Sequence, residues 1–248
     1  MGLLSDVSLW LCLAIVVGAF LTGVLHGATG MLGGIVMTAL LSQIIGIKQA
    51  IPVMTCALVF SHASRVFIYR KDIDRSIAAR VLIFGGPTLI FGAYLFSILD
   101  PKIIAIVFVC FLILSFPMKY YARSHNIKTG PKLLSFASII WGMLAGNVIG
   151  PGFFLAPFLL GTGMNRLAFV GTLAGITLAM NSIKLVVFGT TNLLNAELLA
   201  LGVLVGLCTI PGNWAGKAIL QKLSDDHHRY IVDGFTLLVI FNFLYLAF

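Results

Sequence analysis

Residues 23–34 of this chain read GVLHGATGMLGG, and residues 142–152 read GMLAGNVIGPG. At an offset of 119 residues, three glycines of the two stretches coincide: Gly23 with Gly142, Gly27 with Gly146 and Gly33 with Gly152. Each glycine in a helix interior costs about 1 kcal/mol relative to alanine, so these stretches disfavour a continuous helix. The sequence therefore predicts one helix break in each half of the chain, with helices that resume at Ile35 and Phe153.

The composition around these stretches is that of a membrane protein. Sixty per cent of the 248 residues are apolar and ten per cent are charged, which is more apolar surface than a soluble globule can bury. A bilayer core about 30 Å thick takes about 20 apolar residues per helix. The chain is predicted to be an all-α, polytopic integral membrane protein with one membrane domain. The first 47 residues contain no Lys or Arg, so no separate signal peptide is expected.

Apolar runs separated by Gly, Pro and charged clusters predict ten segments. They cover residues 7–25, 28–46, 50–69, 79–98, 102–120, 132–148, 149–162, 167–188, 196–218 and 230–247. The first two segments of each half are joined by almost no polar loop. Each of these pairs is either two short crossings or a re-entrant hairpin, and the sequence leaves that choice open.

The orientation follows from the positions of the basic residues, which favour the cytoplasmic side. Most lie in loops that the segment count places on one side: Arg70, Lys71, Arg75, Arg80, Lys119, Arg123, Lys128, Lys132, Arg166, Lys217, Lys222 and Arg229. These are 12 of the 16 Lys and Arg residues, and both termini are then predicted on the outer face. Basic residues in short loops act as topology signals, so the formal charge of +8 does not indicate a nucleic-acid partner.

An odd number of segments in each half means that the second half enters the membrane from the opposite side. We therefore predict an inverted repeat, with residues 1–124 as the first unit and residues 131–248 as the second. A further match supports it, because residues 87–92 (PTLIFG) align with residues 211–216 (PGNWAG) at an offset of 124. Inverted repeats of this kind underlie many secondary transporters.

The two predicted breaks indicate an anion site near the bilayer midplane. Helices that restart there present free backbone N–H groups and positive dipole ends, and glycine lets an oxyanion approach the main chain. The candidate substrate-binding residues at the breaks are His26, Gly27, Thr29, Gly30, Gly33, Gly34, Asn147, Gly150, Pro151 and Gly152. The alternative is that GxxxG at 23–27 and 142–146 only lets helices pack closely.

Ionisable groups inside spans are the second source of candidates, because leaving one in lipid costs at least about 2.5–3.5 kcal/mol. They comprise His62 and Arg65 on one helix face, and Lys184, which aligns with Arg65 at an offset of 119. Snorkelling to the membrane surface is the alternative for both cations. Asn181 and Asn213 complete the candidates, with interhelical hydrogen bonding as the alternative. All eight carboxylates lie at termini, in loops or near span ends, so an anionic substrate is favoured over a cation.

The sequence gives no sign of an enzyme. It contains no GxSxG, HExxH or CxxC motif, and its four cysteines lie singly in apolar runs. We therefore expect neither catalytic residues nor a metal site nor a cofactor.

Residues 30–34 (GMLGG), 150–157 (GPGFFLAP) and 211–216 (PGNWAG) resemble the TauE/SafE family of sulfite and organosulfonate exporters, in the 4-toluene sulfonate uptake permease superfamily. The resemblance covers nearly the whole chain and implies a transporter of small sulfur-containing anions in the bacterial inner membrane. Two features depart from it. Met31 and Leu32 interrupt the first glycine run, and Thr38 stands where the second half has Pro157.

We expect a secondary transporter that works by alternating access and exports sulfite, sulfoacetate or another sulfonate. Sulfoacetate is the first choice, with its sulfonate on the helix amino ends and its carboxylate on Arg65 or Lys184. An anion channel and a membrane protein that binds a partner without transport are the alternatives. The sequence leaves the oligomeric state open and is compatible with a homodimer.

Overall fold

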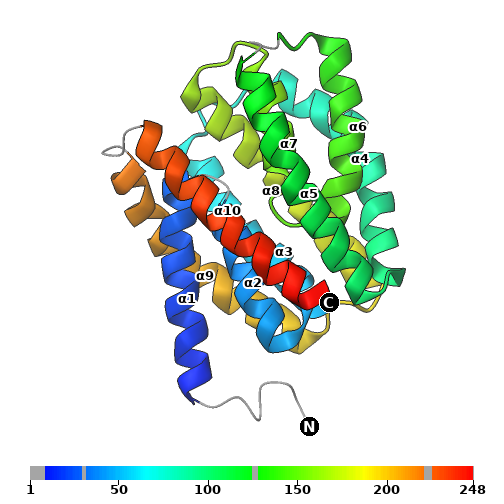
Figure 1. The fold of residues 1–248 in the computed structure, drawn as a ribbon, viewed down its shortest axis with the longest axis vertical. Helices are drawn as coiled ribbons and strands as arrows, with labels where there is room; N and C mark the ends of the chain where they lie inside the picture. Colours follow the sequence, from blue (N-terminus) through cyan, green and yellow to red (C-terminus); the bar gives the residue numbers. More distant parts are fainter. Residues whose placement is uncertain (1–8, 30–31, 125–127, 221–224, 248) are drawn as a thin grey trace.

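The protein is all-helical throughout the residues that the computed structural model describes, which are 9–29, 32–124, 128–220 and 225–247. The helices are α1 (Leu9–Thr29), α2 (Leu32–Ile45), α3 (Ile47–Ile68), α4 (Arg75–Ile98), α5 (Pro101–Ser124), α6 (Pro131–Asn147), α7 (Gly152–Leu160), α8 (Arg166–Thr190), α9 (Ala196–Leu220) and α10 (Asp225–Ala247) (Figure 1). Each of the ten predicted segments corresponds to one helix. The fold class predicted from composition is confirmed.

Helix length and composition fit a membrane-spanning body. Among the described residues, five helices are long and apolar enough to cross a bilayer, namely α1, α3, α4, α8 and α9. Large apolar side chains are exposed on the outside of the bundle, as on Phe67, Tyr94 and Phe241. By contrast, α7 has nine residues and is about 13 Å long, so it cannot cross a 30 Å core by itself.

The first predicted break is shorter than the sequence indicated. The helix α1 continues through Gly23 and Gly27 to Thr29, and α2 already begins at Leu32. The expected restart at Ile35 was therefore three residues late. In the second half, α6 ends at Asn147 and α7 begins at Gly152, one residue before the expected restart. A breaking tendency at Gly23 and Gly27 is overridden by tertiary packing.

That packing is a close approach of α1 to α9. A Cβ atom added to Gly23 would lie 2.7 Å from the carbonyl oxygen of Thr209, and one added to Gly27 would overlap the backbone of Asn213. The helices α4 and α6 meet in the same way. A Cβ on Gly142 would overlap the backbone of Gly85, one on Gly146 would overlap the backbone of Gly92, and one on Gly85 would lie 2.7 Å from the carbonyl oxygen of Ser138. The close-packing interpretation of the GxxxG spacing thus holds for both helix pairs.

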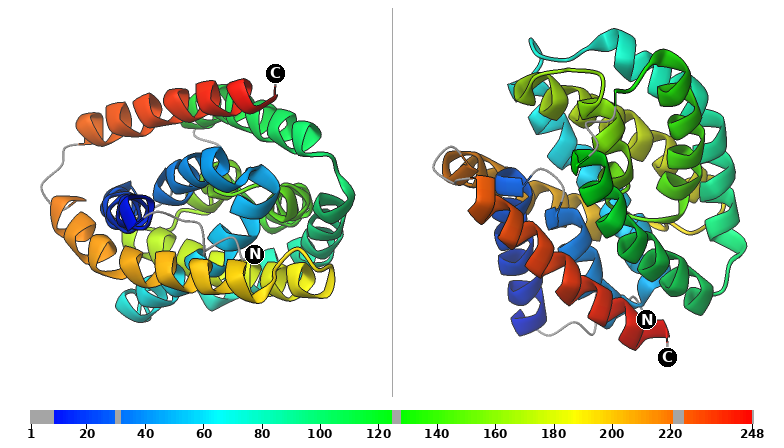
Figure 2. Two further views of the ribbon diagram at one scale, coloured as in Figure 1. Left: turned by 90° about the horizontal axis from the view of Figure 1, so that it is seen from below. Right: turned by 45° about the horizontal axis from the view of Figure 1, so that its top comes forward.

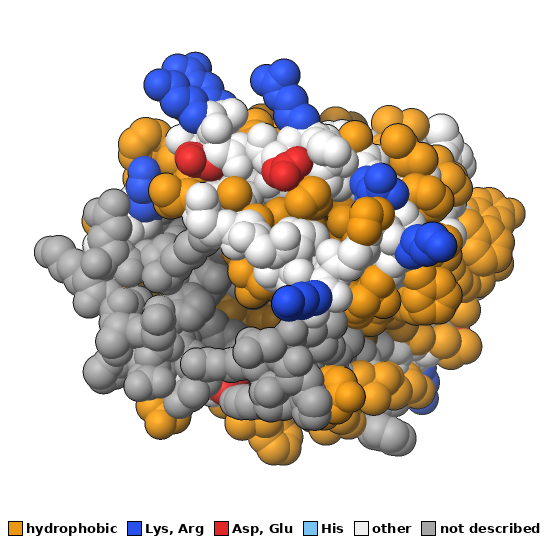
Figure 3. All heavy atoms as spheres, turned by 90° about the horizontal axis from the view of Figure 1, so that it is seen from above, with side chains coloured by type: hydrophobic (Ala, Val, Ile, Leu, Met, Phe, Trp, Pro, Cys, Tyr) orange, Lys and Arg blue, Asp and Glu red, His pale blue; other side chains and the backbone are white. Residues whose placement is uncertain are grey.

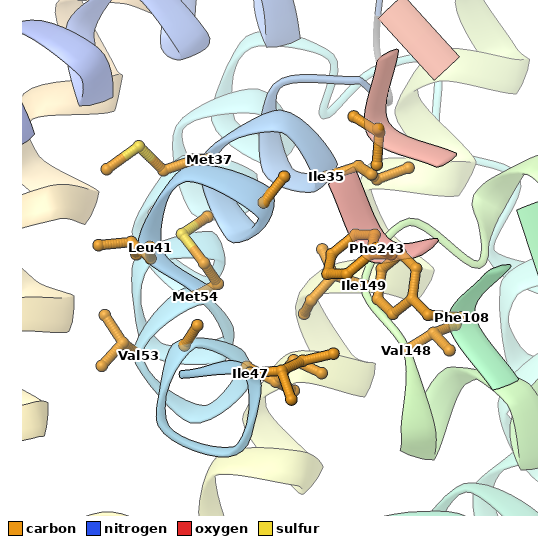
Figure 4. Close-up of a cluster of buried hydrophobic side chains, with 14 of the residues drawn as sticks. Ile35, Met37, Leu41, Ile47, Val53, Met54, Phe108, Val148, Ile149 and Phe243 are labelled. Atoms are coloured by element: carbon orange, nitrogen blue, oxygen red, sulfur yellow. The ribbon is translucent and has the colours of Figure 1, made fainter. Parts of the chain in front are cut away.

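The remaining helices complete the bundle around these two pairs. The helix α3 packs against both α8 and α9, and α4 packs against α8. Seen from below, α5 and α10 lie along one side and α9 along the opposite side (Figure 2). Between them, apolar side chains from α2, α3, α5, α10 and the segment before α7 form a continuous core, which includes Ile35, Met54, Phe108 and Phe243 (Figure 4).

One end of the bundle carries most of the basic loops. The segments that join α3 to α4 and α7 to α8 lie toward the top of Figure 1, and several Lys and Arg side chains project from that face in Figure 3. Exposed basic residues of these two segments, of the segment before α6 and of the adjoining helix ends include Arg70, Lys71, Arg75, Lys128 and Lys132. The start of α1 and the end of α10 lie toward the opposite end of the bundle.

Candidate functional site

A cavity of about 30 Å³ lies between the first turn of α2 and the turn that precedes α7. We call it the central cavity. The residues that line it are His26, Gly34, Leu58, His62, Arg65, Ile149, Gly150, Pro151, Gly152, Leu173, Thr177, Met180 and Asn181. They come from α1, α2, α3 and α8 and from the segment between α6 and α7. Residues more than 150 positions apart in the chain thus share one site.

The first half contributes a cluster of three basic side chains to this cavity, each of them about 95% buried. Arg65 Nη1 lies 3.2 Å from His26 Nε2, and the rings of His26 and His62 stand edge to face with centroids 5.3 Å apart. Because a guanidinium can only donate, His26 Nε2 accepts this hydrogen bond and the ring hydrogen of a neutral His26 lies on Nδ1. His26 Nδ1 and His62 Nδ1 are both buried without a partner among the described residues. Such groups are available to a ligand.

The second half contributes backbone and one amide. Gly150 has a φ of +81°, a conformation that glycine adopts without strain, and this turn brings residues 149–152 to the cavity wall. The Asn181 side chain donates from Nδ2 to the carbonyl oxygen of Thr177 at 2.8 Å, and its Oδ1 has no partner among the described residues. The amide can present either its oxygen or, after rotation, an N–H group to the cavity.

The amino ends of α2 and α7 offer fewer free N–H groups than the sequence suggested. The amide of Leu32 donates to Thr29 Oγ1 at 3.2 Å. At α7, the Phe153 amide donates to the carbonyl oxygen of Gly150 and the Phe154 amide to that of Pro151. The expectation that the helix at Phe153 presents free donors was therefore wrong at these positions, because the turn that breaks the helix also satisfies its first amides. Gly34 in the first turn of α2 and Gly152 at the start of α7 still line the cavity.

None of the described residues that line the cavity carries a carboxylate. Arg65 supplies a buried positive charge, and the histidines supply polar hydrogens beside it. Such a lining favours an anion, because a cation would meet Arg65 with no acidic group nearby.

A model of the family described as sulfite exporter TauE/SafE matches residues 15–243. The chain belongs to this family. No curated protein and no solved structure matches the chain significantly. As a TauE/SafE member it is a multi-pass membrane protein of the sulfite and sulfonate transporter type, which implies a small anionic substrate and contact with lipid.

Among the predicted substrate-binding residues of this TauE/SafE protein, Lys184 differs most from its expected position. It is fully buried, yet it does not line the central cavity. Its Nζ donates to the carbonyl oxygen of Val148 at 3.3 Å and lies 5.5 Å from the centroid of the Phe188 ring. The side chain therefore does not snorkel to the surface. It binds the carboxyl end of α6, where backbone carbonyls lack helical partners and the helix dipole is negative.

Several other predicted residues also lie outside the cavity lining. Gly27 packs on Asn213 of α9, and Gly33 packs on Thr22 and His26 of α1. Thr29 Oγ1 donates to the carbonyl oxygen of Leu25. Gly30 lies outside the described residues.

The two remaining asparagines link helices or their own turn. Asn213 Nδ2 donates to Ser61 Oγ at 2.8 Å and so ties α9 to α3. Asn147 Nδ2 donates to the carbonyl oxygen of Met143 at 3.0 Å. The interhelical alternative therefore describes Asn213.

The sequence did not single out the apolar part of the lining. Leu58, Leu173 and Met180 line the cavity, and so does Thr177. Leu58, Thr177 and Met180 carried a usable signal, since each lies four residues before a predicted site residue on the same helix, namely His62, Asn181 and Lys184.

Proposed function

We propose that this protein is a secondary transporter that holds a small sulfur oxyanion in the central cavity and moves it by alternating access. The observation that carries the proposal is the buried Arg65, which faces a cavity with two histidines and no carboxylate among its described lining. The guanidinium of an arginine can donate charge-assisted hydrogen bonds to two of the three oxygens of a sulfite or sulfonate group at once.

The size of the cavity supports a closed state around a compact substrate. A volume of about 30 Å³ holds roughly two water molecules. A sulfite or a one- or two-carbon sulfonate requires a modest expansion, whereas an aryl sulfonate requires separation of the helices. We therefore propose sulfite and short sulfonates as substrates.

Helix pairing supports the inverted repeat that alternating access needs. In an inverted repeat, α1 to α5 correspond in order to α6 to α10. The counterpart of the pair α1 with α9 is then the pair α6 with α4, and the helices of both pairs are in close contact. The pairs α3 with α8 and α5 with α10 map onto themselves, and both are also in contact. We propose residues 1–124 and 131–248 as the two units, which rock about the central cavity.

The charge distribution supports the orientation. The end of the bundle with the exposed basic loops is proposed to face the cytoplasm of a bacterium, and both termini to face outward. An interior-negative potential favours the exit of an anion by about 2.3 kcal/mol per charge per 100 mV. We therefore propose export across the inner membrane.

Efflux of sulfite from proteoliposomes tests the proposal. We expect wild-type protein to release internal sulfite, R65M to lose at least about ten-fold in rate, and R65K to retain part of it because the charge remains. R75M is the matched control, since Arg75 is exposed at the start of α4, away from the cavity lining. Equal rates for R65M and R75M would overturn the assignment, and unitary conductance steps in a planar bilayer would identify a channel instead.

A further inference from the structure

A second cavity, of about 10 Å³, adjoins the central cavity. We call it the side cavity. The two cavities share three lining residues, His26, Gly34 and Leu58, which form their common wall. Gly34 contributes no side chain to this wall, and a Cβ atom there would lie 3.2 Å from the Leu58 side chain. The side cavity therefore borders directly on the proposed substrate site.

The side cavity lies on the side of the central cavity that is farther from the basic loops. Along α1 its lining extends from His26 back to Thr22, and along α3 from Leu58 back to Met54. Each step of four residues is about 6 Å of helix. The helix α1 begins at the end of the bundle opposite the basic loops, whereas α3 ends near them (Figure 1). The side cavity thus extends toward the end of the bundle that is proposed to face outward.

Three hydroxyl groups line the side cavity. They belong to Thr22 of α1, Ser61 of α3 and Thr209 of α9, and all three side chains are buried. Each threonine hydroxyl donates at 2.7 Å to a backbone carbonyl oxygen of its own helix, and Ser61 Oγ accepts from Asn213 Nδ2 at 2.8 Å. A hydroxyl group rotates about its C–O bond, so it can turn its hydrogen toward an oxyanion. The side cavity can therefore offer donors to an anion.

These donors carry no charge. The described residues that line the side cavity include no Lys, Arg, Asp or Glu. At the common wall, the ring hydrogen of a neutral His26 lies on Nδ1, which is buried without a partner among the described residues. A path through a membrane protein needs sites that bind weakly enough for release. An anion that leaves Arg65 in this direction meets neutral donors, which bind it less tightly than a guanidinium does.

The rest of the lining can make room for a substrate. A volume of about 10 Å³ holds roughly one water molecule, so a sulfur oxyanion requires a wider space. Met37 and Met54 line the side cavity. Methionine side chains are unbranched and flexible, so these two can change rotamer without a shift of the backbone.

We propose that the side cavity is the outward section of the substrate path, an inference that rests on the function proposed above. The oxyanion that dissociates from Arg65 passes His26 and Gly34 and then accepts hydrogen bonds from the three hydroxyl groups. The outward path therefore runs between α1, α2, α3 and α9, and the two methionines close it in this structure.

The double variant T22V/T209V tests the hydroxyl groups, because valine keeps the shape of threonine and removes the donor. We expect sulfite efflux from proteoliposomes to fall at least about five-fold, because two hydrogen bonds along the path are lost. Sulfite affinity, measured by isothermal titration calorimetry in nanodiscs, should stay within about two-fold of wild type, because neither threonine lines the central cavity.

T55V is the matched control, and its efflux should equal that of wild type. Thr55 is buried in α3 and donates to a backbone carbonyl oxygen of its own helix at 2.8 Å, as the two threonines of the side cavity do. Thr55 lines neither cavity.

The membrane-impermeant sulfonate MTSES, which forms a disulfide with a cysteine thiol, tests access from outside. T209C and T55C are each introduced into the full-length chain after replacement of its four native cysteines. MTSES in the external medium of right-side-out vesicles should inactivate T209C during efflux and leave T55C active. External sulfite should slow the inactivation of T209C.

The outcomes separate this inference from the function on which it rests. Normal efflux by T22V/T209V, or equal effects of MTSES on T209C and T55C, would overturn the outward path and leave the transporter proposal intact. Inactivation of T209C from the cytoplasmic side alone would also overturn it. If wild-type protein neither binds nor releases sulfite, the proposed function fails as well.

Discussion

Arg65 and Lys184 lie 119 residues apart at matching positions of α3 and α8, yet only Arg65 lines the central cavity. Each cation meets the carboxyl end of the first helix of its own half. Arg65 reaches His26 in the last turn of α1, and Lys184 reaches the carbonyl of Val148 just after α6. The two cations differ in the group that accepts their hydrogen bond. In α1 a side chain accepts the hydrogen bond within the cavity wall, whereas in α6 the backbone accepts it outside the wall.

This comparison shows that a charged residue in a membrane span does not necessarily belong to a binding site. A carboxyl-terminal helix end is a partner for a buried cation, and it competes with a substrate for the same charge. The following predictions test how far the two halves share this design.

The largest effect is expected where helices touch through glycine. We expect G85A and G23A each to lower the free energy of unfolding by about 3 kcal/mol or more, the upper end of the range for overpacking. The reason is that the added methyl group meets backbone atoms of α6 in G85A and of α9 in G23A. G86A is the matched control, because a Cβ at Gly86 has no neighbour within 4 Å and alanine favours a helix. SDS-induced unfolding measures the free energies. Equal stability of G85A and G86A would show that α4 and α6 do not approach each other as closely as the structure indicates.

The next effect separates the two cations. K184M should lose about 1.5–3 kcal/mol of stability, because a charge-assisted hydrogen bond to a buried carbonyl disappears. Sulfite efflux per folded molecule should stay within two-fold of wild type. K184R keeps the charge and is expected to be intermediate in stability. A K184M protein of normal stability that no longer transports would place Lys184 at the substrate.

A smaller effect is expected at the turn before α7. G150A should cost about 1–2 kcal/mol, because alanine is strained at a φ of +81° and its methyl group would meet the Ile35 side chain. I35A removes part of that clash. The double variant G150A/I35A should therefore be less destabilised than the sum of the single variants, which a double-mutant cycle in SDS measures. Strict additivity would show that the two residues do not touch.

The smallest effect is expected at the first break. T29V removes the acceptor for the Leu32 amide at the start of α2, and loss of such a cap costs about 1 kcal/mol. Thr29 does not line the cavity, so efflux should be unchanged. A large loss of efflux with normal stability would return Thr29 to the substrate site.

The sequence predicted the helices well because apolar length and charged loops are local properties. It also selected His26, His62, Arg65 and Asn181, which are conspicuous in an apolar chain and line the cavity, but it did not select Thr177. It misjudged the first break, because the penalty of Gly23 and Gly27 in an isolated helix is offset by packing on α9. It could not separate Arg65 from Lys184, because both are single cations on equivalent helices.

By itself, the sequence determined that this is a membrane protein, that its described residues form ten helices, and that it belongs to the TauE/SafE family. Those properties depend on hydrophobicity and on motifs along the chain. Only the tertiary structure decided which glycines pack against other helices, which glycines border the cavity, and which of the two buried cations lines it. These outcomes depend on contacts between different helices, such as Arg65 with His26 and Lys184 with Val148. No local sequence pattern records which partner the end of a helix will find.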